Sequence, residues 1–369
     1  MRKFTAFACL LLAALGIVVA QAQDATPTIE PWVCPESVQA MENKTLNIFN
    51  WATYIGETTI PDFEKLCGAS VTLDYFDGDE SMLTRLRQGN PGYDIVIPSD
   101  YAVPTMIEEG LLLPLDHARM PNLDNLIPEL RAAPFDPESE YAVPYLWGTF
   151  GIGYNVNTVQ GPVSSWRQFF EHDGPVAWME DPRIMLSIAL AVTGSDPNSS
   201  DPAELDTAKQ YLLDHSDNVV IIAADDGQEW LAKGDVDMVI EYNGDIFQIG
   251  LDCQCEDFAY VLPQEGSGIS SGFIAIPTGA QNPDLAQVFI DYILDPQVNA
   301  EIANYTAYPS PNQAAIEAGL IDPIMLENPG IYPPEEILDN LYFLLPQDVD
   351  TEQLFNDIWT EIKIALQSG

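Results

Sequence analysis

Apolar and polar positions alternate along the first third of the chain with two periods, one typical of strands and one of helices. The short apolar runs of buried strands occupy residues 45–51, 70–76 and 93–99. Between them, residues 58–68 and 79–89 carry apolar side chains at helical spacing, and each segment ends at a glycine, a common helix end. Asp79 is expected to cap the second helix. Strands alternating with helices imply right-handed crossovers and a parallel sheet, so we predict an α/β fold.

The pattern changes near residue 148, where Gly148, Gly151 and Gly153 interrupt an apolar, strand-like run. Glycines there suit close packing and also suit a strand that leaves one lobe for another. A second unit of helices and strands follows, and a return strand is expected within residues 268–279. The predicted organisation has two lobes and a leader: 23–44 as leader, 45–148 with 273–305 as the first lobe, and 149–272 with 306–369, including C-terminal helices, as the second.

The first 22 residues have the pattern of a secretory signal peptide. Arg2 and Lys3 precede an apolar stretch of about 14 residues, and the small residues Ala20 and Ala22 mark a cleavage position. A membrane anchor is the alternative, but about 20 apolar residues are needed to span a bilayer. We therefore predict cleavage near Ala22 and a mature protein that is periplasmic or otherwise outside the cytoplasm. The leader, rich in Pro, Thr and Glu, is expected to lie on the surface.

The net charge limits the partners. Thirteen Lys and Arg against 57 Asp and Glu give −44 at pH 7. Such a charge repels nucleic acid and attracts cations, although it can also serve only solubility in salt or acid. No nucleic-acid partner is expected, but the charge alone does not locate a site.

Four cysteines follow the signal peptide, an even number that favours disulfides in an exported chain: Cys34, Cys67, Cys253 and Cys255. We predict a bond between Cys34 and Cys67, because the other pairings would send the neighbours Cys253 and Cys255 to separate partners. A metal site at these two neighbours is the alternative, but it has no nearby histidine, so no metal is predicted. Whether Cys253 and Cys255 bond to each other stays open.

Enzyme signatures are scarce. The chain has no zinc-protease motif, phosphate loop or dinucleotide fingerprint. Ser270 stands in a Gly-x-Ser-x-Gly string, but a nucleophile elbow needs a strand before the serine and a helix after it, whereas a glycine-rich loop and an extended run flank Ser270. A pair of catalytic carboxylates has no fixed spacing and stays open. Binding is therefore favoured over catalysis, with no cofactor.

Aromatic and acidic residues gather where predicted strands end, which is where α/β proteins bind ligands. They are Trp51, Tyr54, Ser99, Tyr101, Asp181, Tyr242 and Asp245. Aromatic rings attract a cation through their faces, and a buried carboxylate needs a cationic partner, so together they suit an organic ammonium. Each has a plainer explanation, since Asp181 and Asp245 are placed to cap helices and the aromatic residues could belong to the core.

At these residues the chain resembles the periplasmic spermidine/putrescine-binding proteins of polyamine ABC transporters. The likeness runs from about residue 45 to the end and is carried by segments that are specific together: NIFNWATYI, YDIVIPSDYAV, EEGLLLPLD, FDPESEYAVPYLWGTFGIGYN, SSW, YNGD, FIAIPTGAQNP and AYPSPNQAA. The resemblance implies a two-lobed type II periplasmic-binding-protein fold, each lobe a mixed, mostly parallel sheet flanked by helices, that closes on a polyamine and hands it to a membrane permease.

The resemblance also assigns roles. Trp51 matches an aromatic wall of the ligand site. Tyr54 and Ser99 match ligand contacts of the first lobe, and Tyr101 follows Ser99 at the spacing found in the family. Asp181 matches a carboxylate that binds an ammonium group. Tyr242 stands where the family usually has tryptophan, Asp245 resembles an acid of the putrescine-preferring branch, and Tyr308 matches a lining tyrosine. The chain departs from the family where Ser270 and Gly272 replace a Trp-x-Asp pair, where Ile184 and Thr53 replace acids, and where Phe343 replaces a glutamine.

We therefore expect a monomeric, exported substrate-binding component of an ABC importer, capturing a polyamine of the putrescine or spermidine kind. Fewer carboxylates than in the family leave the choice of amine open, and another organic cation is an alternative cargo. Two other functions stay open: a sensor that uses the same cleft, and a secreted hydrolase that uses two carboxylates or Ser270.

Overall fold

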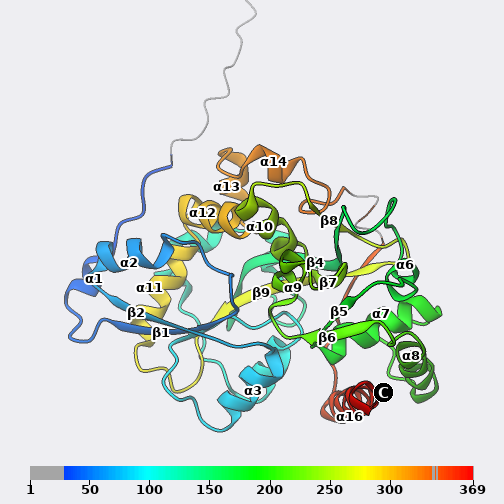
Figure 1. Ribbon diagram of the computed structural model, residues 1–369. Coiled ribbons are helices and arrows are strands. Elements are labelled where there is room, and N and C mark those ends of the chain that lie inside the picture. Colours follow the sequence, from blue (N-terminus) through cyan, green and yellow to red (C-terminus); the bar gives the residue numbers. More distant parts are fainter. Residues whose placement is uncertain (1–28, 335–336, 338–339, 369) are drawn as a thin grey trace, which may run out of the picture.

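The computed structural model describes residues 29–334, 337 and 340–368. Its strands are β1 Thr45–Asn50, β2 Ser70–Tyr75, β3 Ile95–Val96, β4 Ala142–Asn155, β5 Val176–Met179, β6 Val219–Ala223, β7 Met238–Tyr242, β8 Phe258–Val261, β9 Ser267–Ala275 and β10 Leu341–Phe343. They form one mixed sheet in the order β2-β1-β3-β9-β4-β7-β5-β6, with β10 beside β9 and β8 beside β4. We call the part around β1, β2 and β3 the first lobe and the part around β5, β6 and β7 the second lobe; they occupy opposite sides of Figure 1.

Helices flank both parts of the sheet. In chain order they are α1 Glu36–Gln39, α2 Thr59–Cys67, α3 Asp79–Arg87, α4 Val103–Glu108, the 3-10 helices η1 His117–Arg119 and η2 Pro121–Asn125, α5 Pro128–Arg131, α6 Trp166–Phe170, α7 Pro182–Thr193, α8 Pro202–Asp214, α9 Gly227–Lys233, α10 Asn243–Cys253, α11 Pro283–Ile293, α12 Pro296–Thr306, α13 Gln313–Glu317, α14 Pro323–Leu326 and α16 Val349–Ser368. No helix in the described part of the chain is long and apolar enough to cross a membrane.

The first lobe follows the predicted alternation of strands and helices. β1 pairs in parallel with β2 and β3, and α2 ends at Gly68, whose φ of 64° is a left-handed conformation that glycine adopts without strain. The strand predicted at 93–99 is shorter, because only Ile95 and Val96 pair with β1. Beyond them Ser99 makes an isolated antiparallel bridge to Gly272, which brings the end of this strand to β9.

The long strand β4 joins the two lobes. Its first half pairs with β9 in the first lobe, and its second half pairs with β7 and β8 in the second. The glycines predicted at this crossing are needed for close packing. A Cβ atom on Gly153 would lie 2.3 Å from the Ile246 side chain, and one on Gly151 would lie 2.5 Å from the Val261 carbonyl oxygen.

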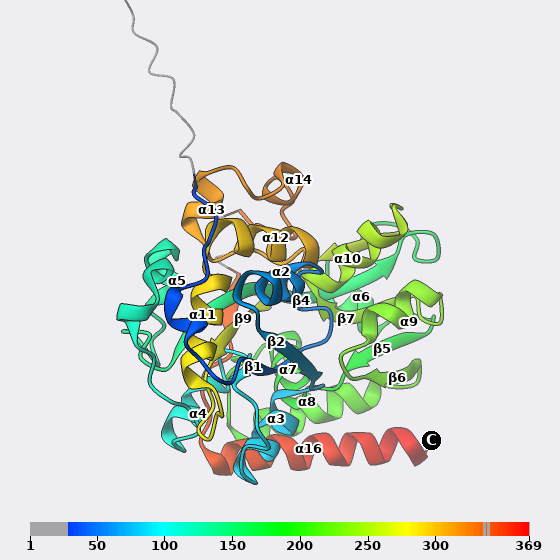
Figure 2. The same ribbon diagram turned by 90° about the vertical axis from the view of Figure 1, so that its left-hand side faces the viewer.

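The second lobe is built around α7, which is buried on nearly all sides. Asp181 caps its first turn by accepting a hydrogen bond from the Ile184 N–H at 2.8 Å, Pro182 occupies its first position, and Gly194 ends it with a φ of 88°. Apolar side chains from β5, β7 and α16 complete this core. Helix α16 packs along the base of the molecule against α7 and α8, as Figure 2 shows.

The leader segment differs from the prediction. Residues 29–44 do not simply lie on the surface: Val38 is fully buried, and the Trp32 ring packs 4.9 Å from the Tyr292 ring in the first core. The Trp32 indole N–H also donates to Asp291 at 3.0 Å. Most of these residues are exposed or half-exposed, as expected for a surface leader, but Val38 and Trp32 anchor the segment on the first core, which its polar composition does not indicate. The predicted signal peptide, residues 1–22, lies outside the described residues.

The structure contains the predicted disulfide between Cys34 and Cys67 and a second one between Cys253 and Cys255. The first bond ties the leader to the end of α2. The second closes a very short loop at the end of α10, where Gln254 has a φ of 51°. The open question about Cys253 and Cys255 is thus answered in the structure: they bond to each other.

The segments after residue 306 pack in both lobes. Ala315, Ile321 and Met325 join the first core, whereas Phe355 and Trp359 of α16 join the second. The predicted lobe boundaries remain a prediction, since contacts within a core do not fix where one lobe ends.

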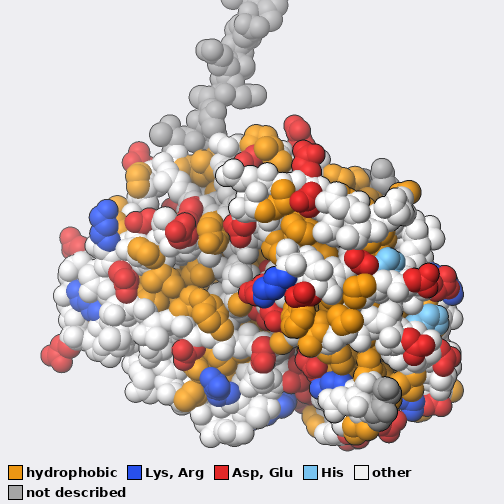
Figure 3. Space-filling view, in the orientation of Figure 1, with side chains coloured by type: hydrophobic (Ala, Val, Ile, Leu, Met, Phe, Trp, Pro, Cys, Tyr) orange, Lys and Arg blue, Asp and Glu red, His pale blue; other side chains and the backbone are white. Residues whose placement is uncertain are grey.

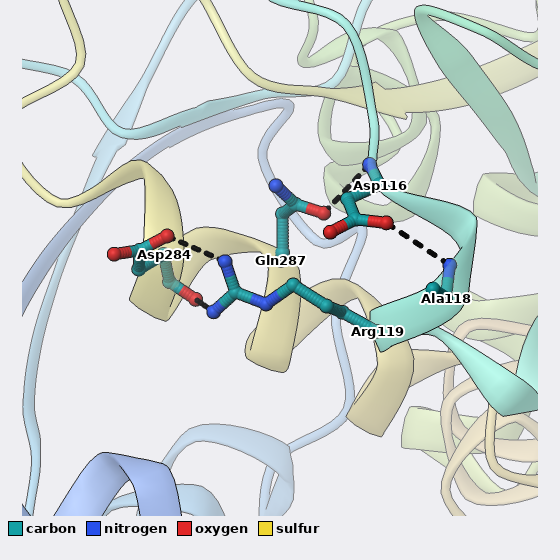
Figure 4. A network of polar contacts seen from close by, with 5 residues as sticks. All are labelled: Asp116, Ala118, Arg119, Asp284 and Gln287. Carbon is teal, nitrogen blue, oxygen red and sulfur yellow. Dashed lines mark hydrogen bonds and ion pairs between the residues drawn. The ribbon is translucent and has the colours of Figure 1, made fainter.

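A polar network holds η1 on the start of α11 (Figure 4). Arg119 pairs with the Asp284 carboxylate, and its second amino group donates to the Asp284 carbonyl oxygen at 3.2 Å. The Asp116 N–H donates to the side-chain oxygen of Gln287 at 2.8 Å, and the Asp116 carboxylate caps η1 by accepting from the Ala118 N–H. Because Asp284 is largely exposed, the ion pair contributes little, and the buried Gln287 is the firmer anchor. This anchored loop belongs to the scaffold of the first lobe.

Candidate functional site

A cavity of about 40 Å³ lies between the lobes at the strand ends. Its lining residues come from both lobes: Trp51, Ala52, Tyr54, Ser99, Asp225, Tyr242, Asp245, Ser270, Gly272 and Tyr308. Six of the eight residues that the sequence predicted for the site line this cavity, and the remaining Tyr101 and Asp181 do not. The structure thus brings most of the predicted residues together, although they are spread over more than 250 positions of the chain.

Two aromatic side chains from opposite lobes border the cavity. Trp51 follows β1, its indole N–H donates to the Ile97 carbonyl oxygen at 2.9 Å, and its ring packs 4.5 Å from Phe76. Tyr242 ends β7 and, like Trp51, is half-buried. The hydrogen bond fixes the indole plane, so that part of its surface stays available to a ligand in the cavity.

Asp245 is held by residues that border the first lobe. The Tyr308 hydroxyl donates to one oxygen of its carboxylate, and the Thr53 hydroxyl donates to the other at 3.0 Å. Thr53 has a φ of 52°, a strained conformation for a β-branched residue that places its hydroxyl toward Asp245. The Tyr54 ring packs edge-on against the Tyr308 ring at 4.8 Å. Asp245 is therefore not a helix cap, since α10 is capped by Tyr242.

Asp225 is a second lining carboxylate, and the sequence prediction missed it. It follows β6, and its Oδ2 accepts a hydrogen bond at 2.9 Å from the Ala52 N–H in the opposite lobe. The signal was present, because an acidic pair directly after an apolar run and before a glycine is the usual end of a strand. The run at 219–223 is an unbroken apolar stretch without strand alternation, so its pattern alone does not predict β6 or mark its end.

Tyr101 and Asp181 contact each other beside the cavity. The Tyr101 hydroxyl donates to Asp181 Oδ2 at 3.0 Å, while Asp181 Oδ1 caps α7. Tyr101 lines a neighbouring cavity together with Glu80 and Arg183. The helix cap predicted at Asp181 is confirmed, and its predicted contact with an ammonium stays a prediction.

Ser99 and Gly272 close the first-lobe side of the cavity. The Ser99 N–H donates to Asp79 Oδ1 at 3.0 Å, so the fully buried Asp79 carboxylate supports the site. The prediction that Asp79 caps α3 is wrong, because Gly78 stands at that position. A Cβ atom on Gly272 would lie 2.9 Å from the Tyr54 ring, so a larger residue there would require Tyr54 to move.

The electrostatics of this region favour a cation. Burial, the first cause in each case, raises the pKa of Asp245 to about 6, of Asp100 to about 7 and of Glu80 to about 8. It also raises the pKa of Asp181 and, well above the usual value, that of Asp225. No Lys or Arg is among the residues that line the cavity. A bound cation would stabilise the charged carboxylates and lower these pKa values again. On the face drawn in Figure 3, acidic side chains are scattered among uncharged ones, with few Lys or Arg.

This geometry defines a binding protein: a small cavity between two lobes joined by β4, with aromatic rings, hydroxyls and carboxylates directed at one ligand. A family model of bacterial extracellular solute-binding proteins matches residues 58–328. The chain belongs to this family. The two-lobed type II fold is confirmed by solved structures of similar proteins, and the family's extracellular character confirms the predicted location outside the cytoplasm.

Individual relatives cover most of the chain. The putrescine-binding periplasmic protein SpuD of Pseudomonas aeruginosa (strain UCBPP-PA14) is 32% identical over 346 residues, 88% of this chain and 93% of SpuD. The putrescine-binding periplasmic protein PotF of Escherichia coli (strain K12) is 33% identical over 344 residues, 88% of this chain and 92% of PotF. A solved structure from Listeria monocytogenes, assigned to a spermidine/putrescine ABC transporter, superposes with a TM-score of 0.82 at 31% identity and covers 87% of this chain and 99% of that one.

Proposed function

We propose that this protein captures a polyamine of the putrescine or spermidine kind outside the cytoplasm and delivers it to the membrane permease of an ABC importer. One observation carries the proposal: the cavity combines aromatic walls with the buried carboxylate of Asp245 and the half-buried one of Asp225, and its lining has no basic side chain. A buried carboxylate without a cation is costly, so such a lining is complementary to an alkyl-ammonium ligand. The names of SpuD and PotF, which state that those proteins bind putrescine, support the same class of cargo.

The predicted residues have distinct roles in this proposal. Trp51 and Tyr242 lie against the carbon chain of the amine from opposite lobes, and each ring contributes roughly 0.5 to 2 kcal/mol of cation–π attraction to an ammonium. Asp245 neutralises one ammonium from within the cavity, and Asp181 acts on the other end from beside Tyr101. The ammonium N–H groups donate hydrogen bonds to the hydroxyl oxygens of Ser99, Tyr54 and Tyr308, and these bonds fix the position of the ligand.

The protein is proposed to bind its cargo without chemical change. Ser270 lies inside β9, opposite Gly148 of β4, rather than at a turn between a strand and a helix. This position does not suit a nucleophile elbow. No histidine is among the residues that line the cavity. A serine there would lack a histidine as its base, which supports reversible binding over hydrolysis by a Ser–His mechanism.

Thermal unfolding of the mature protein with putrescine, cadaverine, agmatine, spermidine and spermine tests the proposal. A ligand at 100 times its dissociation constant adds about 2.7 kcal/mol to native stability, so at least one amine should raise the melting temperature by several degrees. Butane-1,4-diol, which has the carbon chain of putrescine without its charges, is the matched control. Sodium chloride at equal ionic strength controls for general screening of the acidic surface. If no amine stabilises the protein more than these controls do, the proposal is wrong.

A further inference from the structure

Asp225 occupies an unusual place, because its carboxylate belongs to the second lobe and contacts the first. It stands between β6 and α9 and lines the cavity together with Trp51 and Asp245. Its Oδ2 accepts the 2.9 Å hydrogen bond from Ala52 N–H, the residue after Trp51. None of the described residues donates a hydrogen bond to its other oxygen, Oδ1. One oxygen of Asp225 thus bridges the lobes, and the other can contact a ligand.

Ordinary structural roles do not account for this side chain. Asp226, not Asp225, precedes the first residue of α9, and the Asp226 carboxylate accepts from the Trp230 indole N–H. Within the described part of the chain, no ion pair joins Asp225 to a Lys or Arg, and no cluster of acidic, His and Cys side chains is arranged to hold a metal ion. Asp225 is therefore neither a cap, nor half of an ion pair, nor a metal ligand.

The groups that face Asp225 are mostly acidic. Asp245 lies across the cavity, Asp77 faces Asp225 from the first lobe, and Asp226 and Glu241 lie beside it; each carboxylate raises the pKa of a neighbour. Among the residues that line an adjoining hollow with Asp225, Arg85 is the one cation. Arg85 donates to the Tyr93 hydroxyl at 2.8 Å and lies over the Phe49 ring, so it is engaged elsewhere. Without a ligand, Asp225 is repelled both by Asp245 of its own lobe and by Asp77 of the first lobe.

We infer that Asp225 binds an ammonium group of the cargo together with Asp245, and that it couples capture of this charge to closure of the lobes. The inference rests on the proposed function and adds to it a residue and a means of control. When an ammonium pairs with both carboxylates, their repulsion ends and Asp225 is held against Ala52 N–H. Trp51 directly precedes Ala52 in the chain. When the charge of Asp225 is neutralised and Asp225 holds Ala52, the Trp51 ring is therefore also held against the ligand. In the absence of the cation, the repulsion between Asp225 and Asp77 of the first lobe favours the open form.

Three variants separate the effect of the Asp225 charge from the effect of its hydrogen bond to the Ala52 N–H. Asp225→Asn removes the charge but keeps an oxygen that can accept from Ala52 N–H, and Asp225→Ala removes both. Asp226→Asn removes the same charge from the neighbouring residue, which does not line the cavity, and is the matched control. Calorimetric titration with putrescine measures affinity, and small-angle X-ray scattering measures the compaction on binding.

We expect Asp225→Asn to bind putrescine at least about tenfold more weakly than wild type, because an ammonium loses one of its paired charges. Asp226→Asn should stay within about threefold of wild type, since Asp226 does not line the cavity and its carboxylate is engaged with the Trp230 indole. With saturating putrescine, Asp225→Asn should compact as wild type does, and Asp225→Ala should compact less. Without ligand, Asp225→Asn should melt at or above the wild-type temperature, because a repulsion is removed; a merely structural role would lower it.

The outcomes are distinguishable. If wild type binds putrescine and Asp225→Asn binds it equally well, the inference is overturned while the proposed function stands. Equal losses of putrescine affinity in Asp225→Asn and Asp226→Asn also overturn the inference, since the overall negative charge of the region would then explain both losses. If wild type binds none of the amines, the proposed function fails and this inference fails with it. A selective loss in Asp225→Asn with undiminished stability of the ligand-free protein supports it.

Discussion

The hydroxyl of Tyr101 donates a hydrogen bond to Asp181 Oδ2 at 3.0 Å, and this bond joins the turn before α4 in the first lobe to the start of α7 in the second. Two other aspartates of the second lobe also accept from first-lobe donors: Asp225 accepts from the Ala52 N–H and Asp245 from the Thr53 hydroxyl. The closed arrangement therefore depends on second-lobe carboxylates, the same type of group that an ammonium ligand would neutralise.

Tyr101→Phe tests this contact with the loss of one oxygen atom. A hydrogen bond to a charged group contributes about 1.5 to 3 kcal/mol, so we expect roughly tenfold weaker putrescine binding in calorimetric titration. Tyr305→Phe, in which an exposed hydroxyl is removed, should bind as wild type does. Wild-type affinity in Tyr101→Phe would show that the lobes close without this bond.

The buried carboxylates predict how the stability of the ligand-free protein depends on pH. Burial raises the pKa of Asp79 to about 6, of Asp100 to about 7 and of Glu80 to about 8. A carboxyl group whose pKa is raised by folding holds its proton more tightly in the folded state. Its contribution to stability is fully present below its unfolded pKa, near 4, and is lost as pH rises through the folded pKa.

The ligand-free protein should therefore melt at a higher temperature near pH 5 than near pH 8, with each of these groups contributing up to roughly 3 kcal/mol to the difference. Calorimetric melting across this range measures it. Saturating putrescine should reduce the difference, because a bound cation favours the charged forms. A melting temperature that rises steadily from pH 5 to pH 8 would contradict the raised pKa values.

The two disulfides should differ in what they contribute. Cys34 and Cys67 are 33 positions apart, and closing a loop of this length stabilises the folded state by about 3 to 4 kcal/mol in the chain-entropy account. Cys253 and Cys255 are 2 positions apart, so their bond should contribute less than half as much. Urea unfolding of the two double alanine variants compares the free energies directly. Equal losses of unfolding free energy in the two variants would mean that the Cys34–Cys67 bond does not stabilise the protein by restraining the leader.

The helices and strands that depend on short-range apolar spacing could be predicted from the sequence. The alternation of β1, α2, β2 and α3 follows from apolar spacing, and Gly68 marks the end of α2. The pairing of β9 with both β3 and β4 could not be predicted, because it joins segments more than 100 residues apart and depends on the tertiary packing of the sheet. The short length of β3 also depends on the tertiary packing of the sheet.

The candidate site divides in a similar way. Trp51 and Asp245 could be found because they follow strands with clear apolar patterns. Asp225 was missed because β6 is only partly buried and its strand pattern was not recognised. Thr53 was noted only as a lost acid, since its strained backbone and its bond to Asp245 exist only in the folded protein. Charged residues that contact the opposite lobe are the part of a site that sequence patterns reveal least.

Gly244 and Gly250, both in α10, allow a test of the support behind Asp245. A Cβ atom on Gly244 would lie 2.1 Å from the Tyr308 ring, whereas the nearest atom to one on Gly250 is 3.8 Å away. Gly244→Ala therefore forces Tyr308 away and breaks its hydrogen bond to Asp245. Overpacking of this kind costs about 1 to 3 kcal/mol of stability, and the displaced hydroxyl should weaken putrescine binding about tenfold or more.

Gly250→Ala should act in the opposite direction on stability. Alanine is favoured over glycine in a helix by about 0.8 to 1 kcal/mol, so this variant should unfold at a slightly higher urea concentration and bind putrescine as wild type does. The same substitution in one helix thus separates helix propensity from the contact with Tyr308. If both variants were stabilised and bound putrescine equally well, Tyr308 could move without loss, and the placement of Asp245 would not depend on its hydroxyl.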